Sequence, residues 1–369
     1  MHALTRGTIL GDALRGPWGQ CSHGVCRARP YPDSPIERSA CYVSPRASLS
    51  STILKTPPIE FKKLKEIVDL PEWLGVGAAR IHEFLEHPER CYTKIRLAKK
   101  NKKHPKSAVR IVYKVDKELA ALQRHIARSI ALTPLGSFPE YVQGFVGGRS
   151  IATNAEKHRA KKLVLCVDLK DFFESIHRES VQDIFRLLGC GKDAAAALAS
   201  LCTLGDSLPQ GASSSPILSN LAARTLDADM LILGQVSQCA YSRYADDMTF
   251  SGDTVPIEEQ IDEAAKKNGF SINHDKTLLQ PRGRRQYVTG LTVCDPVRPR
   301  VPRRFKKNLR LALRCAEKYG LNKHCANSGD EPQQLWGRIS YVNGIEPELG
   351  KQFLKQYHNA IAIDRRSTE

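Results

Sequence analysis

Several features of membrane and secreted proteins are missing from this chain of 369 residues. No apolar run approaches the roughly 20 residues that a membrane-spanning helix requires, and the beginning of the chain lacks an apolar core followed by a cleavage site. The eleven cysteines include no Cys-x-x-Cys pair, which is typical of reduced thiols rather than of a disulfide framework. The sequence therefore predicts a soluble cytoplasmic protein without a membrane partner.

Acidic residues are scarce relative to basic ones. The chain holds 56 Lys and Arg against 39 Asp and Glu, a formal net charge of +17 at pH 7. Such an excess favours a polyanionic partner, with nucleic acid preferred over a membrane surface. A basic protein without such a partner is the alternative. The length is sufficient for two or three subdomains and a sizeable core.

Two of the acids are adjacent, in Tyr244-Ala245-Asp246-Asp247. β-prone residues flank the pair, which predicts a hairpin with the carboxylates at its tip. Adjacent carboxylates repel each other in the absence of a cation, and hard ions such as Mg²⁺ prefer carboxylate oxygens. Since turns are rich in Asp, a solvated acidic turn is the alternative interpretation.

A third carboxylate, Asp168, follows residues 161–167, in which two lysines precede a continuous apolar run typical of a buried strand. A carboxylate at the end of a buried strand is poorly solvated and needs a partner. If this strand pairs beside the hairpin, Asp168 meets Asp246 and Asp247, and these three are the predicted metal ligands and catalytic groups. Three carboxylates at one place can hold two divalent ions about 3.5–4 Å apart, as in in-line phosphoryl transfer.

These acidic segments resemble the palm of a reverse transcriptase, a right-hand polymerase that copies RNA into DNA. The resemblance rests on Asp168-Leu-Lys-Asp-Phe-Phe173 and Tyr-Ala-Asp-Asp, with Leu208-Pro-Gln-Gly211 between them in the family's order. It implies an α+β fold with fingers, a palm made of an antiparallel sheet plus helices, and a helical thumb. It also implies deoxynucleoside triphosphates as substrates and two Mg²⁺ ions as the cofactor.

The resemblance covers residues of about 50–357 and divides the chain into four parts. They are an irregular extension over 1–57, fingers over 58–160, a palm over 161–295 with a fingers segment at about 177–210, and a basic helical thumb over 296–369. A zinc site in the extension is disfavoured because the spacing matches no common pattern, and disorder or loose docking is expected there. Its candidate ligands are Cys21, His23, Cys26 and Cys41.

Further residues receive roles from the same resemblance. Phe173 would stack under the incoming sugar and reject a ribose 2′-OH, with core packing as the alternative for both Phe172 and Phe173. Lys276 would protonate the leaving pyrophosphate, with an ordinary surface lysine as the alternative. The basic run over 94–106 either grips phosphates or is a solvated loop. Candidates for binding nucleotide and template are Gln210, Gly211, Arg110, Lys114 and Arg149.

Two short motifs narrow the resemblance to retron-type reverse transcriptases: Asn154-Ala-x-x-His158 and Val288-Thr289-Gly290. By itself, an Asn four residues before a His is more often a surface or capping pair. The retron type implies a cognate structured noncoding RNA, DNA synthesis primed from a 2′-OH, a branched RNA–DNA product, and bacterial anti-phage defence with an effector protein. RNA recognition is assigned to both motifs and to the thumb residues Arg304, Lys307, Arg310 and Arg314.

Two alternatives stay open at this stage. One is a reverse transcriptase of the diversity-generating or group II intron-like kind, against which the Asn154 and His158 motif argues. The other is an RNA-binding scaffold that sequesters an effector, with polymerisation incidental. Intact carboxylates argue against lost catalysis but are compatible with an added scaffold role.

Overall fold

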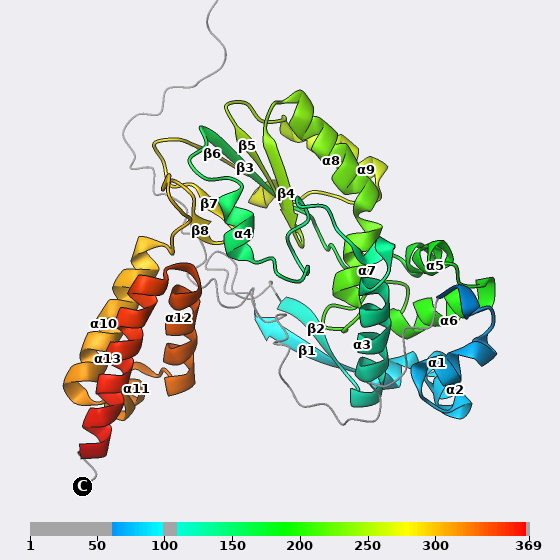
Figure 1. The fold of residues 1–369 in the computed structure, drawn as a ribbon, viewed down its shortest axis with the longest axis horizontal. Coiled ribbons are helices and arrows are strands. Elements are labelled where there is room, and N and C mark those ends of the chain that lie inside the picture. Colours follow the sequence, from blue (N-terminus) through cyan, green and yellow to red (C-terminus); the bar gives the residue numbers. More distant parts are fainter. Residues whose placement is uncertain (1–60, 99–108, 367–369) are drawn as a thin grey trace, which may run out of the picture. The chain divides into compact units, whose positions relative to one another are not determined.

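The structure is a computed structural model that describes residues 61–98 and 109–366 (Figure 1). All described residues belong to one compact unit. The predicted extension over 1–57, with its candidate zinc ligands, and the basic residues 99–106 lie outside the described residues.

A four-stranded antiparallel sheet with the strand order β4-β5-β3-β6 lies at the centre of this unit. The apolar run that predicted a buried strand is β3, which pairs with β5 on one side and β6 on the other, and β4 and β5 form the predicted hairpin. Helix α8 packs on β4, and α9 packs on α8 (Figure 1). The elements are β3 (Leu163–Asp168), β4 (Ala240–Tyr244), β5 (Asp247–Gly252), β6 (Leu278–Pro281), α8 (Arg224–Val236) and α9 (Glu258–Lys267).

Helices that precede and follow β3 in the chain, together with an earlier two-stranded hairpin, share one hydrophobic core with this sheet. In α3 the apolar residues are buried on one face, and the Asp116 carboxylate caps the helix by accepting hydrogen bonds from the amides of Glu118 and Leu119. The hairpin strands are β1 (Tyr92–Ala98) and β2 (Val109–Val115). The helices are α1 (Leu70–Leu74), α2 (Ala78–Glu86), α3 (Lys117–Ala131), α5 (Arg178–Leu187), α6 (Lys192–Cys202) and α7 (Ser215–Ala222), with short 3₁₀ helices η2 (Phe61–Lys63), η3 (Ile67–Asp69), η4 (Pro88–Cys91) and η5 (Pro134–Gly136).

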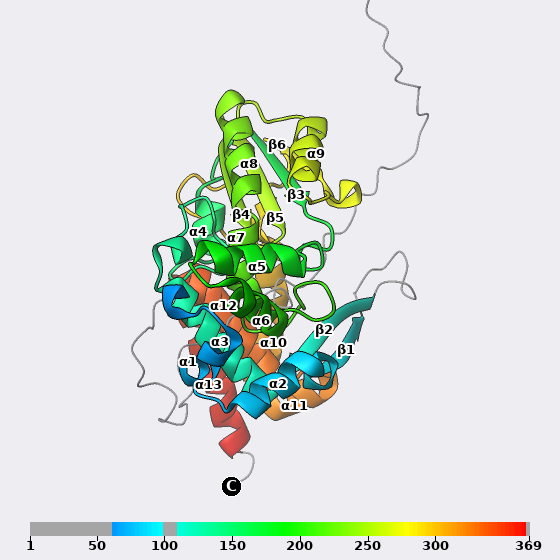
Figure 2. The same cartoon turned by 90° about the vertical axis from the view of Figure 1, so that its right-hand side faces the viewer.

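The last part of the chain forms helices around a second core. On α10 the apolar residues Leu309 and Leu313 are buried, while its many basic residues occupy the exposed face. This core also contains Ala155 and Val164, so the packing continues across the predicted thumb boundary. Figure 2 shows the same elements from the side. They are α4 (Ile151–Glu156), β7 (Tyr287–Val288), β8 (Leu291–Thr292), α10 (Arg303–Tyr319), α11 (Leu321–Ser328), α12 (Pro332–Ile345) and α13 (Pro347–Arg366).

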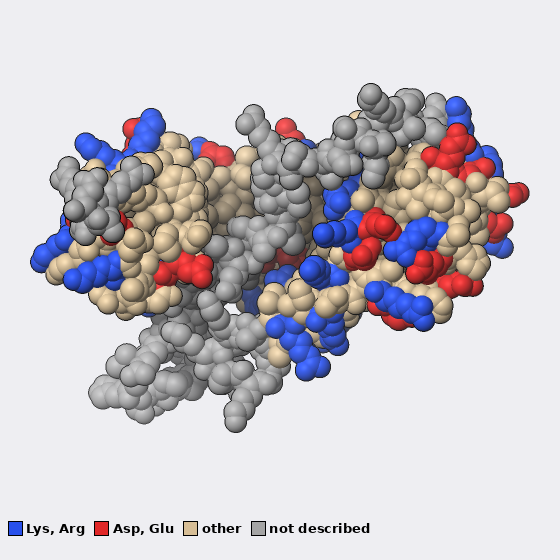
Figure 3. All heavy atoms as spheres, turned by 90° about the horizontal axis from the view of Figure 1, so that it is seen from below, with Lys and Arg blue, Asp and Glu red and all other residues tan. Residues whose placement is uncertain are grey.

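The helices and the surface charge can be compared with the predicted absence of a membrane partner and the predicted nucleic acid partner. Within residues 61–98 and 109–366, no helix combines the length and the apolar character needed to cross a membrane. On the face shown in Figure 3, Lys and Arg side chains are spread over the surface with Asp and Glu between them. The positive charge is therefore not gathered into a single patch on that face.

Candidate active site

Strand pairing brings the three predicted carboxylate residues to one end of the sheet. In the β3–β5 register Asp168 lies directly opposite Asp247, and such residues have Cα atoms about 4.5–5.5 Å apart. The amide of Leu169 donates a 2.8 Å hydrogen bond to the carbonyl oxygen of Asp246. Asp168 is 5% exposed, whereas Asp246 and Asp247 are partly exposed. Two acidic motifs that are distant in the sequence therefore meet at the end of β3.

A lysine stands beside the most buried of these carboxylates. Lys276, on the 3₁₀ helix η6 (His274–Lys276), donates from Nζ to both carboxylate oxygens of Asp168, at 2.8 and 2.6 Å. As the side chains stand, no three His, Cys, Asp or Glu of the described residues are grouped closely enough to hold a metal ion. Carboxylate oxygens are nevertheless the ligands that hard divalent ions prefer. The donor set fits such an ion, and the Lys276 ammonium supplies the positive charge next to Asp168.

The backbone of the acidic turn is held in an unusual conformation. Ala245 has φ +58°, in the left-handed region that non-glycine residues seldom adopt. Gly144 lies against it so closely that a Cβ added at Gly144 would stand 2.3 Å from the Ala245 nitrogen. The amide of Arg243 donates to the carbonyl oxygen of Tyr141 at 2.8 Å, and the Gln143 amide donates to the Arg243 carbonyl at 2.7 Å. The segment over 141–144 therefore fixes the strand that leads into the turn.

A buried ion pair beneath the turn was missed by sequence reasoning. Arg243 and Asp227 are 0% and 1% exposed, and their side chains form two hydrogen bonds of 2.8 and 2.6 Å. Burial alone would lower the pKa of Arg243, but the Asp227 carboxylate raises it overall. Arg243 Nη1 also donates to Asn220 Oδ1 and to the carbonyl oxygen of Ala245, both at 3.1 Å. This network links α7 and α8 to the acidic turn.

The two adjacent phenylalanines of the first acidic motif have different environments. Phe172 is 3% exposed and packs against Phe270, with 5.7 Å between ring centroids. Phe173 is partly exposed, and its ring lies 6.0 Å from that of Phe145. Core packing therefore describes Phe172, and Phe173 is the ring of the two that can face a substrate.

Three of the predicted substrate-binding residues come together where β2 meets the loop before α7. Arg110 Nε donates to Gln210 Oε1 at 2.7 Å, and the Tyr113 amide donates to the Gln210 carbonyl oxygen at 2.8 Å. Gly211 has φ +112°, and a Cβ there would stand 2.3 Å from the Tyr113 carbonyl oxygen. Glycine is required at this close approach. Lys114, the neighbour of Tyr113 on β2, is exposed.

The side chain of Arg149, a predicted substrate-binding residue, is hydrogen-bonded to the main chain. Its guanidinium donates to the carbonyl oxygens of Pro139 at 2.5 Å and Phe138 at 2.7 Å, and also to that of Val142. These three bonds brace the segment over 138–142 that leads to Gly144. The guanidinium keeps its positive charge because carbonyl oxygens are neutral, so substrate binding by Arg149 stays a prediction.

The Asn154 and His158 pair is buried in the protein, with both side chains 0% exposed. Ser242 Oγ donates its single proton to Asn154 Oδ1 at 2.6 Å, so the same hydroxyl oxygen accepts a hydrogen bond from His158 Nε2 at 2.7 Å. The other ring nitrogen, His158 Nδ1, then accepts from Ser251 Oγ at 2.7 Å. Burial lowers the pKa of His158 to about 3. The predicted direct contact with RNA is therefore wrong for Asn154 and His158, and so is the alternative of a surface pair. Both side chains are buried and tie α4 to β4 and β5.

The second motif packs on the same helix. Thr289 Oγ1 donates to the carbonyl oxygen of Ile151 on α4 at 3.0 Å, and Thr289 and Gly290 both have positive φ. Val288 is fully buried in the second core, which excludes direct contact with RNA. The two short motifs, distant in the sequence, therefore meet through α4 and the β7–β8 hairpin.

The four predicted RNA-binding residues of α10 are all exposed, as that role requires. Arg310 and Arg314 line a depression of about 350 Å³ together with Lys355 of α13. The Arg310 guanidinium carbon lies 5.7 Å from the ring centroid of Phe353 in this depression. The full set is Arg304, Lys307, Arg310 and Arg314.

Comparison with protein families matches residues 98–288 to the reverse transcriptase (RNA-dependent DNA polymerase) family. This span is just over half of the chain and contains Asp168, the Gln210 loop and the acidic turn. The chain therefore belongs to the reverse transcriptase family.

The curated relatives most relevant to this result are retron reverse transcriptases. The Retron Mx65 reverse transcriptase of Myxococcus xanthus is 33% identical over 271 residues, which cover 67% of this chain and 61% of the relative. The Retron Mx162 reverse transcriptase of the same organism is 31% identical, over 65% of this chain and 56% of the relative. The Retron Ec86 reverse transcriptase of Escherichia coli is 35% identical, over 53% and 61%. The resemblance to retron-type reverse transcriptases is thereby confirmed, and the chain spans about 60% of the length of these relatives.

Proposed function

We propose that this chain is the RNA-directed DNA polymerase of a retron. The observation that carries the proposal is the pairing of Asp168 with Asp247 at the end of two adjacent strands, with Asp246 in the turn between β4 and β5. The central sheet with α8 and α9 is the palm, the β1–β2 hairpin and its surrounding helices are the fingers, and α10 to α13 are the thumb. Family membership supports these assignments.

Each catalytic residue has a role that follows from its position. Two Mg²⁺ ions held by Asp168, Asp246 and Asp247 would supply positive charge for the triphosphate and lower the pKa of the primer hydroxyl. Lys276 Nζ, already hydrogen-bonded to Asp168, would donate a proton to the pyrophosphate as it leaves.

The nucleotide is held by the residues near β2 and the first acidic motif. Arg110 orients the Gln210 side chain, and Gly211 permits the close contact of that loop with β2. Lys114 adds an exposed charge on the same strand. The Phe173 ring would lie under the incoming sugar and clash with a ribose 2′-OH, so deoxynucleotides would be selected.

The similarity to retron reverse transcriptases supports the assignment of the template, the primer, the product and the biological role. The template is a cognate structured noncoding RNA, synthesis begins from a 2′-OH of that RNA, and the product is single-stranded DNA in a branched hybrid. The exposed basic residues of α10 bind the RNA backbone, whereas Asn154 and His158 act by positioning the strands. The protein acts in the bacterial cytoplasm, in defence against phage together with an effector protein.

The test is to express the chain with the noncoding DNA that flanks its gene and to extract small nucleic acids. A discrete short DNA joined to RNA through a debranching-sensitive link is expected. Asp246→Asn is expected to abolish this DNA and to slow extension of an added primer by about 10³-fold, because metal ligation contributes several kcal/mol. Asp183→Asn, which changes an exposed carboxylate on α5, is the control and is expected to retain both activities.

Two other results of this experiment would overturn part of the proposal. Primer extension without a branched product would retain the polymerase and overturn the retron function. Tight RNA binding with neither activity would overturn the polymerase and favour the RNA-binding scaffold.

A further inference from the structure

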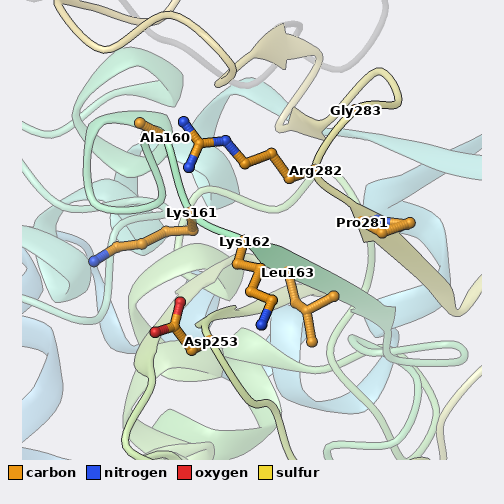
Figure 4. A pocket seen from close by; sticks show the side chains of 8 residues that line it. All are labelled: Ala160, Lys161, Lys162, Leu163, Asp253, Pro281, Arg282 and Gly283. Carbon is orange, nitrogen blue, oxygen red and sulfur yellow. The ribbon is translucent and has the colours of Figure 1, made fainter.

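A depression of about 670 Å³ lies at the opposite end of β3 from the acidic site. It is lined by the residues that enter β3 and by the turns that follow β5 and β6, including Lys162, Asp253 and Arg282 (Figure 4). Asp168 ends the same strand. At about 3.3 Å per residue, the two places are roughly 20 Å apart, so the depression is distinct from the catalytic carboxylates.

The walls of this depression are fixed by main-chain hydrogen bonds. The Arg282 amide donates to the Lys162 carbonyl oxygen, and the Ala160 amide donates to the Val293 carbonyl oxygen, both at 2.7 Å. Gln286 is 1% exposed, and its side-chain amide donates to the carbonyl oxygens of Lys161 and Lys162 at 3.2 and 3.3 Å. The basic side chains therefore start from a backbone that is already in place.

Three cations and one carboxylate line the depression. In Figure 4, Arg282 reaches toward Ala160, Lys162 extends toward Asp253, and Lys161 projects away from Pro281. Within the described part of the chain, no ion pair joins Lys161, Lys162 or Arg282 to a carboxylate. The turn continues with two more exposed cations, Arg284 and Arg285. Cations that border a hollow without an ion-pair partner favour an anionic ligand.

The lining also indicates which anion fits. It contains no aromatic ring, so a nucleobase would find nothing to stack on. Lys and Arg without base-reading groups hold phosphates and carry little sequence information. The volume exceeds that of one phosphate group, and the adjacent Arg284 and Arg285 extend the charge beyond the hollow.

We propose that this depression binds the phosphodiester backbone of a nucleic acid strand, at a site separate from both the active site and α10. The inference rests on the proposed polymerase function, which supplies the nucleic acid. RNA and single-stranded DNA share this chemistry, so either strand can be the ligand.

The test compares the full chain with a variant in which Lys161, Lys162 and Arg282 are all changed to Gln. The dissociation constant is measured at several salt concentrations for a structured RNA hairpin and for a single-stranded DNA of equal length. The variant is expected to bind at least one of them about tenfold more weakly at 150 mM salt, with a salt slope reduced by about 0.7 for each phosphate of a single strand that the variant no longer neutralises. The conservative variant Lys161→Arg, Lys162→Arg, Arg282→Lys is expected to bind like the wild type.

A matched control removes the same charges elsewhere. Lys63→Gln, Lys117→Gln and Arg186→Gln change three exposed residues on η2, α3 and α5, and this variant is expected to keep the wild-type slope. A loss confined to RNA or to DNA identifies the strand. The proposal would be overturned if the test and control variants had equal dissociation constants and equal salt slopes. It would also be overturned if the triple Gln variant lost affinity only for poly-glutamate, which would indicate an acidic protein partner.

The experiments distinguish a depression that does not bind nucleic acid from a chain that is not a polymerase. Extension of a primer on a template too short to reach the depression is expected to be unchanged in the triple Gln variant. If the wild-type chain fails to extend any primer, the proposed function falls, whereas the binding comparison still decides the depression.

Discussion

Arg243 and Asp227 form a buried bidentate ion pair directly beneath the acidic turn, at 2.8 and 2.6 Å. The same guanidinium contacts the carbonyl oxygen of Ala245, the residue before Asp246, at 3.1 Å. The pair therefore couples the stability of the central sheet to the position of the acidic turn.

Asp227→Ala is expected to lower the free energy of unfolding by about 3–5 kcal/mol, because it leaves the Arg243 charge buried without its partner. Chemical denaturation measures this change. The control is Asp229→Ala on the same helix, whose carboxylate pairs with the exposed Lys267 at 3.1 Å. An exposed pair contributes about 0–1 kcal/mol. Equal losses in both variants would contradict a special contribution from the buried pair.

Gly144→Ala is expected to reduce kcat by about 10²-fold, because a Cβ 2.3 Å from the Ala245 nitrogen must displace the turn, and misplacement by about 1 Å can cost that factor. Primer extension at saturating nucleotide measures the effect. At Gly147 an added Cβ meets nothing within 4 Å, so Gly147→Ala is expected to retain activity. Full activity of Gly144→Ala would show that the turn tolerates the displacement.

Phe173→Ala is expected to increase incorporation of ribonucleotides relative to deoxynucleotides, because it removes the ring predicted to lie against the sugar. Single-nucleotide extension with each triphosphate gives the ratio of kcat/KM values. Phe172→Ala is the control: its ring is in the core, so the expected effect is a loss of about 3–5 kcal/mol in stability without a change in sugar selectivity. If the two variants exchange these effects, Phe172 is the selecting residue.

The stability of the fold is expected to fall below pH 6.5 in a way that depends on His158. Burial lowers the pKa of His158 from 6.5 to about 3, so between these values the unfolded chain binds a proton that the folded chain does not. Stability is therefore lost as pH falls through this window, by about 1.4 kcal/mol per pH unit from this group. Denaturation from pH 7 to pH 4 measures the slope.

His158→Gln is expected to be less stable than the wild type at pH 7, with a shallower loss on acidification. His82→Gln removes an exposed histidine on α2 and is expected to keep the wild-type slope. Identical slopes in all three proteins would contradict a neutral buried His158.

The central sheet could be predicted because its strands carry local signals. An apolar run ends in Asp168, and β-prone residues flank Asp246 and Asp247; both patterns became the paired strands. The start of α5 illustrates the limit of such signals. Ser180 and Asp183 have the spacing of a capping box, yet the helix begins at Arg178, whose amide donates to the carbonyl oxygen of Asp206.

Residues whose roles depend on distant partners could not be predicted. Nothing in the spacing of Asp227 and Arg243 indicates that they pair, and a charged Arg149 in a glycine-rich loop gave no sign that carbonyl oxygens occupy it. Asn154 and His158 were identified by their motif, but their burial depends on hydroxyl groups of Ser242 and Ser251 on other elements.

The contact between Lys276 and Asp168 has a consequence for the folding of the sheet. Asp168 and Asp247 lie opposite each other, and their mutual repulsion would oppose folding of this end of the sheet. The Lys276 ammonium, bound to both oxygens of Asp168, offsets that repulsion with a charge the chain carries itself. This end of the sheet therefore carries its own counter-charge for Asp168, so the pairing of β3 with β5 does not depend on a bound cation.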